Sequence, residues 1–129
     1  EKALQVDPDF APAANNLAWN YAEHGGNIDV ALSLAQTAHE KFPGDPSISD
    51  TLGWIYYKKN VFKRATLLFQ ESLEKLQDNP VIHYHLGMAY YKDGKMTLAK
   101  RELERSLELS KVFPGAGEAK EILEELEEK

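Results

Sequence analysis

The chain has 129 residues, 43% hydrophobic and 28% charged, which is enough apolar material for one folded domain with a continuous core. Its formal net charge is -6 and it has no basic stripe, so binding to nucleic acid or to an anionic membrane is disfavoured. Cysteine is absent, which excludes disulfides, thiolate catalysis and zinc–thiolate sites. No apolar run approaches the roughly 20 residues that span a bilayer.

The first segment, 1–10, resembles the end of a helical repeat that occurs again further along the chain. Its Ala3-Leu4 pair corresponds to Ser72-Leu73 in the later copy. Because the chain starts with glutamate and not methionine, we expect a piece of a longer protein whose first repeat is cut. A repeat buries its apolar face only against its neighbours, so this edge should be mobile or should contact a second copy.

Three longer segments follow, 11–45, 46–79 and 80–113, and the last two repeat each other at an offset of 34 positions. Ten identical residues at one offset indicate a repeated structural unit. The first segment aligns with them if its Gly25-Gly26 turn holds one extra residue. The recurring residues are Pro46, Leu52, Gly53, Tyr56, Tyr57, Lys58, Ala65, Ser72, Leu73 and Glu74, which return as Pro80, Leu86, Gly87, Tyr90, Tyr91, Lys92, Ala99, Ser106, Leu107 and Glu108.

Each of the three segments has the pattern of two helices joined by a turn. In the second segment, Leu52, Gly53 and Tyr56 share one face of the first helix, and small or apolar residues recur at i, i+4 and i+7 from Ala65. The small residues Gly53 and Ala65 would let two helix backbones approach closely. The turns are marked by Gly25-Gly26, Lys59-Asn60 and Asp93-Gly94.

The last segment, 114–129, has a different pattern. A helix breaker, Phe113-Pro114-Gly115, is followed by apolar residues at helical spacing among glutamates. This pattern predicts a capping helix near 116–127, with a polar outer face that closes a stack of repeats. The Gly115-Ala116-Gly117 run fits a helix cap better than a phosphate loop, because no strand precedes it.

The 34-residue period, the Leu-Gly pair followed by Tyr, the later Ala and the Pro near the boundary resemble the tetratricopeptide repeat (TPR) family, of bacterial type. The resemblance covers residues 1 to about 110. It implies an all-α right-handed superhelix, or α-α solenoid, of three full hairpins with the first helices lining a concave groove. Departures from the family pattern are Ala14, Ser49 and His83 at the first-helix Trp position, and Gln77 and Lys111 at the closing Pro position.

Helical geometry tests whether that groove could bind a partner. At about 100° per residue, one face of each first helix opposes the core face and should be polar in an ordinary surface helix. Here it carries Trp and Tyr, which form rigid anchors in protein interfaces, and Met, whose flexible side chain adapts to a partner. The alternative is that these aromatics pack between neighbouring first helices. The candidate partner-binding residues are Asn15, Trp19, Asp50, Trp54, Tyr57, Lys58, Tyr84, His85, Met88, Tyr91 and Lys92.

The predicted function is a non-enzymatic scaffold that binds a peptide or helix of a partner protein. We expect no catalytic residues, no cofactor and no metal. His83 and His85 are two positions apart on a helix and point in different directions, so they cannot share a metal ion. Some TPR domains bind a carboxylate terminus through basic groove residues. Those basic residues are missing from the corresponding positions here, so that specificity is not expected.

Three alternatives stay open. The chain could be a self-assembly module, the regulatory TPR region of a larger enzyme, or part of an envelope or exopolysaccharide system. The last follows from a general similarity of its Leu-Ala-Trp, Asp-Thr-Leu-Gly-Trp and Phe-Pro-Gly patterns to bacterial TPR proteins. The sequence has no targeting segment and leaves a cytoplasmic or periplasmic location open.

Overall fold

The computed structural model describes residues 10–128, and over this range the regular structure is entirely helical. The predicted all-α class is therefore confirmed. The expected repeat tail, 1–10, lies outside the described residues except for its last position. The seven helices are α1 (Phe10–Glu23), α2 (Ile28–Lys41), α3 (Pro46–Lys58), α4 (Phe62–Lys75), α5 (Pro80–Lys92), α6 (Met96–Leu109) and α7 (Ala116–Glu127).

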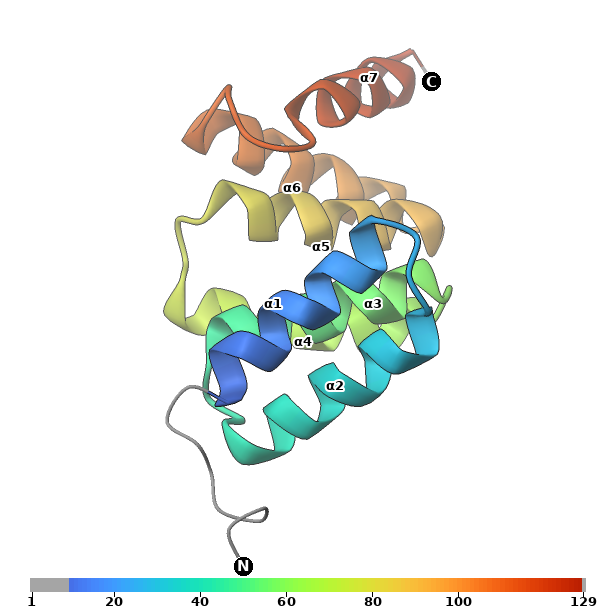
Figure 1. Cartoon of the computed structure of the whole chain (residues 1–129). Coiled ribbons are helices and arrows are strands. Elements are labelled where there is room, and N and C mark those ends of the chain that lie inside the picture. Colours follow the sequence, from blue (N-terminus) through green and yellow to red (C-terminus); the bar gives the residue numbers. More distant parts are fainter. Residues whose placement is uncertain (1–9, 129) are drawn as a thin grey trace, which may run out of the picture.

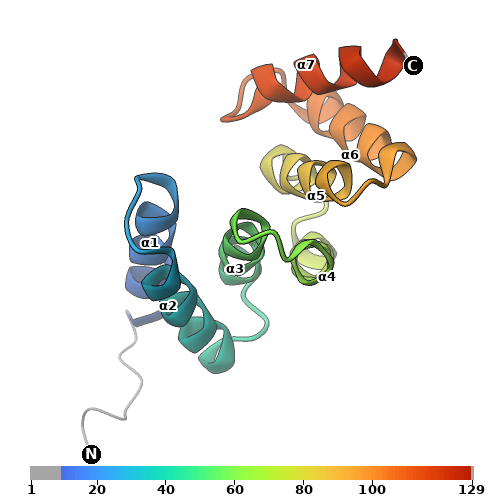
Figure 2. The same ribbon diagram turned by 90° about the vertical axis from the view of Figure 1, so that its right-hand side faces the viewer.

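The helices pair into three hairpins that stack in chain order (Figure 1). The pairs are α1 with α2, α3 with α4, and α5 with α6, and successive hairpins meet through α2 with α3 and α4 with α5. Figure 2 shows α1, α3 and α5 on the inner side of an arc, with α2, α4 and α6 outside. The final helix, α7, packs on α6 and also contacts α5. The fold is the predicted α-α solenoid.

The helices α3 and α5 begin in the same way, 34 residues apart. Asp45 caps α3 by accepting hydrogen bonds from the amides two and three residues further on, at 2.9 and 3.4 Å. Asn79 does the same for α5, at 2.9 and 3.1 Å. Pro46 and Pro80 follow these caps and open the two helices, where proline costs no hydrogen bond. The 34-residue period therefore repeats the same helix start, a capping Asp or Asn followed by Pro.

Two glycines allow the paired helices to approach closely, as the sequence predicted. A Cβ atom on Gly53 would lie 2.7 Å from Cε1 of Phe69 in α4. A Cβ atom on Gly87 would lie 2.7 Å from Cδ2 of Leu103 in α6. Phe69 and Leu103 are fully buried, so neither side chain can move into solvent to make room. The α3–α4 and α5–α6 hairpins depend on the absence of a side chain at this position.

The outer helices turn small or apolar residues toward the core at matching positions of each repeat. The side chains at these positions are buried throughout. They are Ala31, Ala35 and Ala38 in α2, Ala65, Phe69 and Ser72 in α4, and Ala99, Leu103 and Ser106 in α6.

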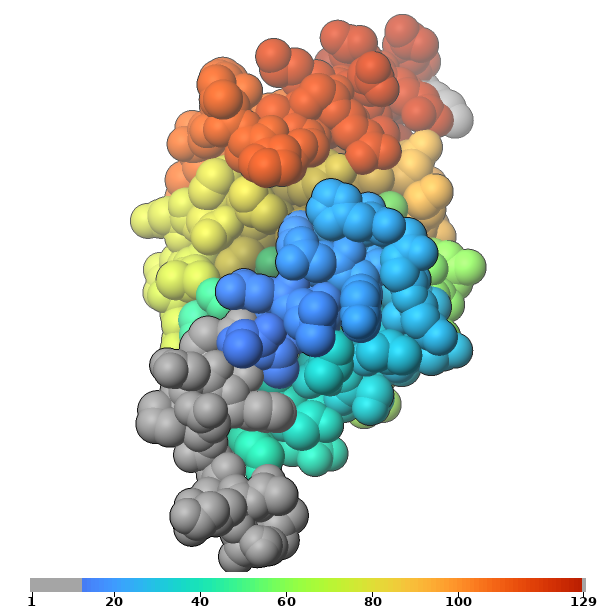
Figure 3. All heavy atoms as spheres, in the orientation of Figure 1, coloured from blue at the N-terminus to red at the C-terminus, as the bar shows by residue number. Residues whose placement is uncertain are grey.

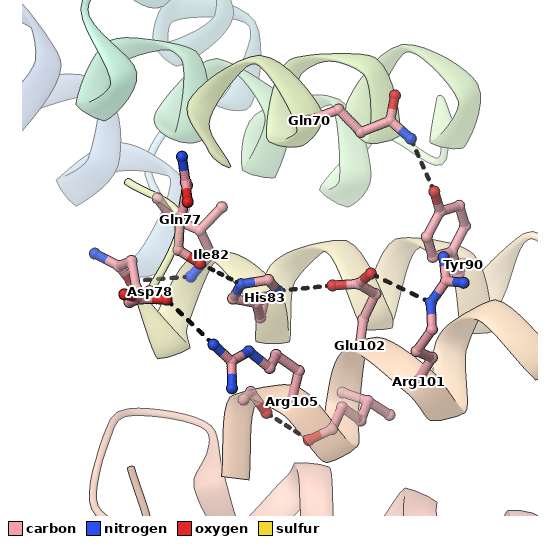
Figure 4. Close-up of polar contacts among 12 residues, drawn as sticks. Gln70, Gln77, Asp78, Ile82, His83, Tyr90, Arg101, Glu102 and Arg105 are labelled. Atoms are coloured by element: carbon pink, nitrogen blue, oxygen red, sulfur yellow. Dashed lines mark hydrogen bonds and ion pairs between the residues drawn. The ribbon is translucent and has the colours of Figure 1, made fainter. Parts of the chain in front are cut away.

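A polar network ties α5 to α6 and to the loop before α5 (Figure 4). Nδ1 of His83 lies 2.7 Å from Oε1 of Glu102, and Nε2 lies 2.7 Å from the carbonyl oxygen of Gln77. Beside them, Arg105 donates to Asp78 at 3.1 Å. Burial acts to lower the pKa of His83, but the bonds to Glu102 and Gln77 outweigh it and the net direction is upward. Both ring nitrogens face acceptors, so the doubly protonated ring fits best.

Tyrosine hydroxyls link neighbouring hairpins at equivalent positions. Gln36 in α2 donates from Nε2 to the hydroxyl of Tyr56 in α3 at 2.9 Å. Gln70 in α4 donates to the hydroxyl of Tyr90 in α5, also at 2.9 Å (Figure 4). The two bonds are one repeat apart, so the same interaction sets the spacing of successive hairpins.

Candidate functional site: the concave channel

Two adjoining pockets form a channel on the inner side of the arc, between α1, α3 and α5. Figure 3 shows the surface hollowed between α1, in blue, and α5, in yellow. The amide pocket, about 240 Å³, is lined by Asn15, Asn16, Trp19, Ser47, Asp50, Thr51, Leu76, Asn79, Val81, Ile82 and His85. The aromatic pocket, about 370 Å³, is lined by Trp19, Glu23, Trp54, Lys58, Val81, Tyr84, His85, Pro114, Gly115 and Glu118. They share Trp19, Val81 and His85, so we treat them as one concave channel.

Stacked rings build the wall of the channel. The ring of Trp54 lies 4.5 Å from that of Tyr57 at an interplanar angle of 9°, and 4.1 Å from the ring of His85 at 26°. Tyr84 is 6.1 Å from Trp54, and Trp19 is 5.9 Å from His85, so the cluster spans α1, α3 and α5. Ring packing of this kind fixes the side chains in place and makes the channel wall rigid.

Glu23 at the end of α1 connects the wall to a cation. The indole Nε1 of Trp54 donates to Oε2 of Glu23 at 2.6 Å. The ammonium of Lys58 lies 3.4 Å from the same oxygen and 5.4 Å from the centre of the Trp54 ring. Lys58 therefore makes an ion pair and a cation–π contact at the same corner of the aromatic pocket.

A second carboxylate comes from the start of α7. The hydroxyl of Tyr84 donates to Oε1 of Glu118 at 2.6 Å. Gly115 opens this helix with φ at 102°, and a Cβ there would clash with the Tyr84 ring. Burial raises the pKa of Tyr84, and the bond to Glu118 raises it further. Burial also raises the pKa of Tyr57 to about 12, with the charge of Glu118 contributing. Glu23 and Glu118 thus bring two carboxylates to the aromatic pocket.

The amide pocket presents hydrogen-bond acceptors. Nδ1 of His85 donates to Oδ1 of Asp50 at 2.8 Å, which holds the carboxylate against α5. Oδ1 of Asn15 is buried and has no hydrogen-bond partner within residues 10–128. A buried carbonyl oxygen without a partner costs free energy, so a donor from a bound molecule would be stabilised there.

The aromatic face is buried at some of its residues and accessible at others. Trp54 is a candidate binding residue, but it is only 8% exposed because Tyr57 and His85 stack on it and Glu23 binds its nitrogen. Tyr84, His85 and Met88 are also buried, since α1, α3 and α5 lie close together. Trp54, Tyr84 and Met88 are therefore packed inside the domain, whereas Trp19, Tyr57 and Tyr91 keep part of their surface accessible.

Seven of the eleven candidate residues line the channel, and four do not. The lining residues are Asn15, Trp19, Asp50, Trp54, Lys58, Tyr84 and His85. Tyr57 stacks on the ring of Trp54. The hydroxyl of Tyr91 donates to Glu125 of α7 at 3.1 Å. The remaining two, Met88 and Lys92, lie outside both pockets.

Two carboxylates of the channel were missing from the candidate set, Glu23 and Glu118. Glu118 is one of the glutamates of the last segment, which was expected to have a polar outer face. It follows Tyr84 by one repeat length, so the 34-residue period, extended into α7, would have placed it beside Tyr84. No group of three or more His, Cys, Asp or Glu side chains among the described residues could hold a metal ion. Nor does any described helix have the length and apolar character needed to cross a membrane.

Stacked two-helix units with a 34-residue period, with inner helices along a channel and a closing helix, are the architecture of tetratricopeptide repeat domains, and this chain has that fold. No family model matches the chain. It is similar to the TPR repeat-containing protein PA4667 of Pseudomonas aeruginosa, with 33% identity over 67 residues, or 52% of this chain. The match spans 11% of that protein's length.

Solved structures, among them a TPR domain, share this fold over nearly the whole chain. The first TPR of Spaghetti (RPAP3), bound to an HSP90 peptide, has a TM-score of 0.82 at 21% identity, covering 97% of this chain and 96% of that one. PcrH in complex with the chaperone binding region of PopD has a TM-score of 0.80 at 17% identity, covering 94% and 93%. The translocator chaperone SycD of Yersinia enterocolitica has a TM-score of 0.82 at 16% identity, covering 98% and 90%.

Proposed function

We propose that this TPR domain is a non-enzymatic scaffold that binds a segment of a partner protein in its concave channel. The observation that carries the proposal is the continuity of the two pockets, which share Trp19, Val81 and His85. A continuous channel can hold several successive residues of a peptide. Its mixture of rigid rings and polar groups resembles the make-up of protein interfaces, where a few aromatic anchors supply most of the affinity.

The residues of the channel divide into two roles in this proposal. Trp19 and Asn15 have accessible surface and would contact the partner directly. Trp54 and His85 are buried and would act as the rigid wall behind them. Preorganised walls lower the entropic cost of binding, since few side chains must be ordered when the partner arrives.

The comparisons support a peptide as the occupant. Two proteins with the same fold, RPAP3 and PcrH, hold an HSP90 peptide and a region of PopD in their solved complexes. For the present chain, the corresponding mode of binding is our proposal.

The experiment is a selection of a random decapeptide library, displayed on phage, on the purified domain. Affinities of the selected peptides for wild type and variants are then measured by fluorescence anisotropy. Trp19→Ala should weaken binding about tenfold or more, because it removes an anchor from both pockets. Leu67→Ala is the matched control, since Leu67 is 61% exposed on the outer helix α4.

A second variant, Asn16→Arg, covers the case in which Trp19→Ala perturbs folding. Asn16 is exposed and lines the amide pocket, so a longer side chain there obstructs the channel without removing a packed ring. Selected peptides that bind both variants as tightly as wild type would contradict the proposal, as would a selection that yields no specific peptide.

A further inference from the structure

The charges of the aromatic pocket do not balance within the pocket. Glu23 and Glu118 contribute two carboxylates, and Lys58 is the cation among the lining residues that the structure describes. All three side chains are exposed enough to meet solvent. The formal charge of the pocket is therefore negative.

The arrangement of rings and carboxylates in this pocket suits a cation. The pocket places the half-buried ring of Trp19 and the edges of the buried rings of Trp54 and Tyr84 among the same lining residues as the two carboxylates. Aromatic faces attract cations through their quadrupole, and a carboxylate adds a charge-assisted hydrogen bond. The chain itself shows this binding mode, because the Lys58 ammonium already lies over Trp54 and against Glu23.

The neighbouring amide pocket also favours a hydrogen-bond donor. Asp50 supplies a carboxylate there, and Oδ1 of Asn15 is a buried acceptor without a partner within residues 10–128. An acidic segment would find no unpaired cation along this channel among the described residues, since Lys58 is paired with Glu23. The same channel would repel the segment through Asp50 and Glu118.

We propose that the partner segment carries an arginine or lysine side chain that enters the aromatic pocket between Glu23 and Glu118 and takes the place of Lys58 on Glu23. This inference rests on the proposed function and adds the chemical class of the partner. The volume of about 370 Å³ lies within the range of roughly 300–1,000 Å³ that is typical of ligand sites. Lys58 is displaced easily because it is an exposed, flexible side chain.

The first test is the composition of the decapeptides selected on the wild-type domain. Arginine and lysine should be enriched at one position relative to the starting library, and raising the salt concentration should weaken binding. Selected peptides that bind specifically without basic enrichment would overturn this inference and leave the proposed function standing. A selection without any specific peptide would contradict the proposed function, and this inference with it.

The second test measures the best basic peptide against charge variants by isothermal titration calorimetry. Glu23→Gln and Glu118→Gln should each weaken binding about tenfold, because each keeps its shape and loses its charge. Lys58→Gln should tighten binding roughly two- to fivefold, because it removes the competing cation. A gain in affinity cannot come from unfolding, so this variant keeps the test independent of stability.

The matched control is Glu104→Gln on α6, an exposed carboxylate outside both pockets. It should leave the affinity within the error of wild type. Equal losses in Glu104→Gln, Glu23→Gln and Glu118→Gln would show that only the overall charge attracts the peptide. That result would overturn the assignment of the aromatic pocket, as would unchanged binding in Lys58→Gln.

Discussion

At the scale of single residues, the absence of a side chain decides how closely the helices pack. Gly53 and Gly87 stand at equivalent repeat positions and face fully buried side chains of the partner helix. Gly117 in α7 is different, because a Cβ there would meet no atom within 4 Å. Glycine is generally unfavourable inside a helix, so a packing reason is needed where it occurs. The two repeat glycines have that reason, and Gly117 does not.

Replacing Gly53 or Gly87 with leucine should lower the free energy of unfolding by about 1–3 kcal/mol or more, because the new side chain overpacks the hairpin. Urea denaturation measures this change. Gly117→Leu is the control and should be neutral or slightly stabilising, since it improves helix propensity in open space. Unchanged stability in both repeat variants would show that these glycines do not set the helix spacing.

At the scale of elements, the inner helices α3 and α5 begin with side-chain caps, as the outer helix α2 does at Asn27, whereas α4 and α6 do not. Asp45 and Asn79 each accept two backbone amide bonds. Val61 and Lys95, at the starts of α4 and α6, make no side-chain cap bond. The inner helices carry the channel residues, so their start points fix the register of the channel.

The cap of α5 can be tested by Asn79→Ala, which should cost about 1 kcal/mol because two amides at the helix start lose their acceptor. Lys95→Ala is the matched control at the uncapped start of α6 and should have little effect. The stability of both variants is measured as a shift of the urea midpoint, with the dependence of the unfolding free energy on urea concentration unchanged. Equal effects of the two variants would mean that the cap does not stabilise α5.

The contact between α5 and α6 should depend on pH through His83. Its pKa in the folded chain is raised above the ordinary value of 6.5, with Glu102 and the Gln77 carbonyl facing the ring and Arg105 nearby. A raised folded-state pKa contributes stability that is fully present below pH 6.5. That contribution falls as the pH rises through the folded-state pKa, because the protonated ring is the form that both acceptors hold.

The melting temperature of wild type should therefore fall more than that of His83→Gln between about pH 6 and about pH 9. Thermal denaturation followed by circular dichroism measures the difference at each pH. His24→Gln is the control, because His24 is exposed in the turn after α1. Parallel pH profiles for wild type and His83→Gln would show that this network does not titrate in the predicted direction.

At the scale of the whole molecule, the sequence period predicts the fold well. The spacing of 34 residues, the Leu-Gly-Tyr pattern and the capping pattern place seven helices in order, and α7 spans Ala116–Glu127. These features are local or strictly periodic, so they can be recognised in a single amino-acid sequence. The channel is harder to predict, because a helical wheel gives the direction of a side chain and not the distance to the next helix. Trp54 points inward as expected, yet neighbouring rings cover it.

The proposed binding channel is tested most directly by mapping where a bound peptide contacts the domain. The chain has two tryptophans, Trp19 and Trp54, and both line the channel. Their indole N–H signals in a proton–nitrogen NMR spectrum therefore report on it without any added label. Titration with a selected decapeptide should shift the Trp19 signal, and displacement of Lys58 from Glu23 should shift that of Trp54. Saturable binding that leaves both indole signals unmoved, while amide signals of α4 or α6 move, would contradict the concave channel as the binding surface.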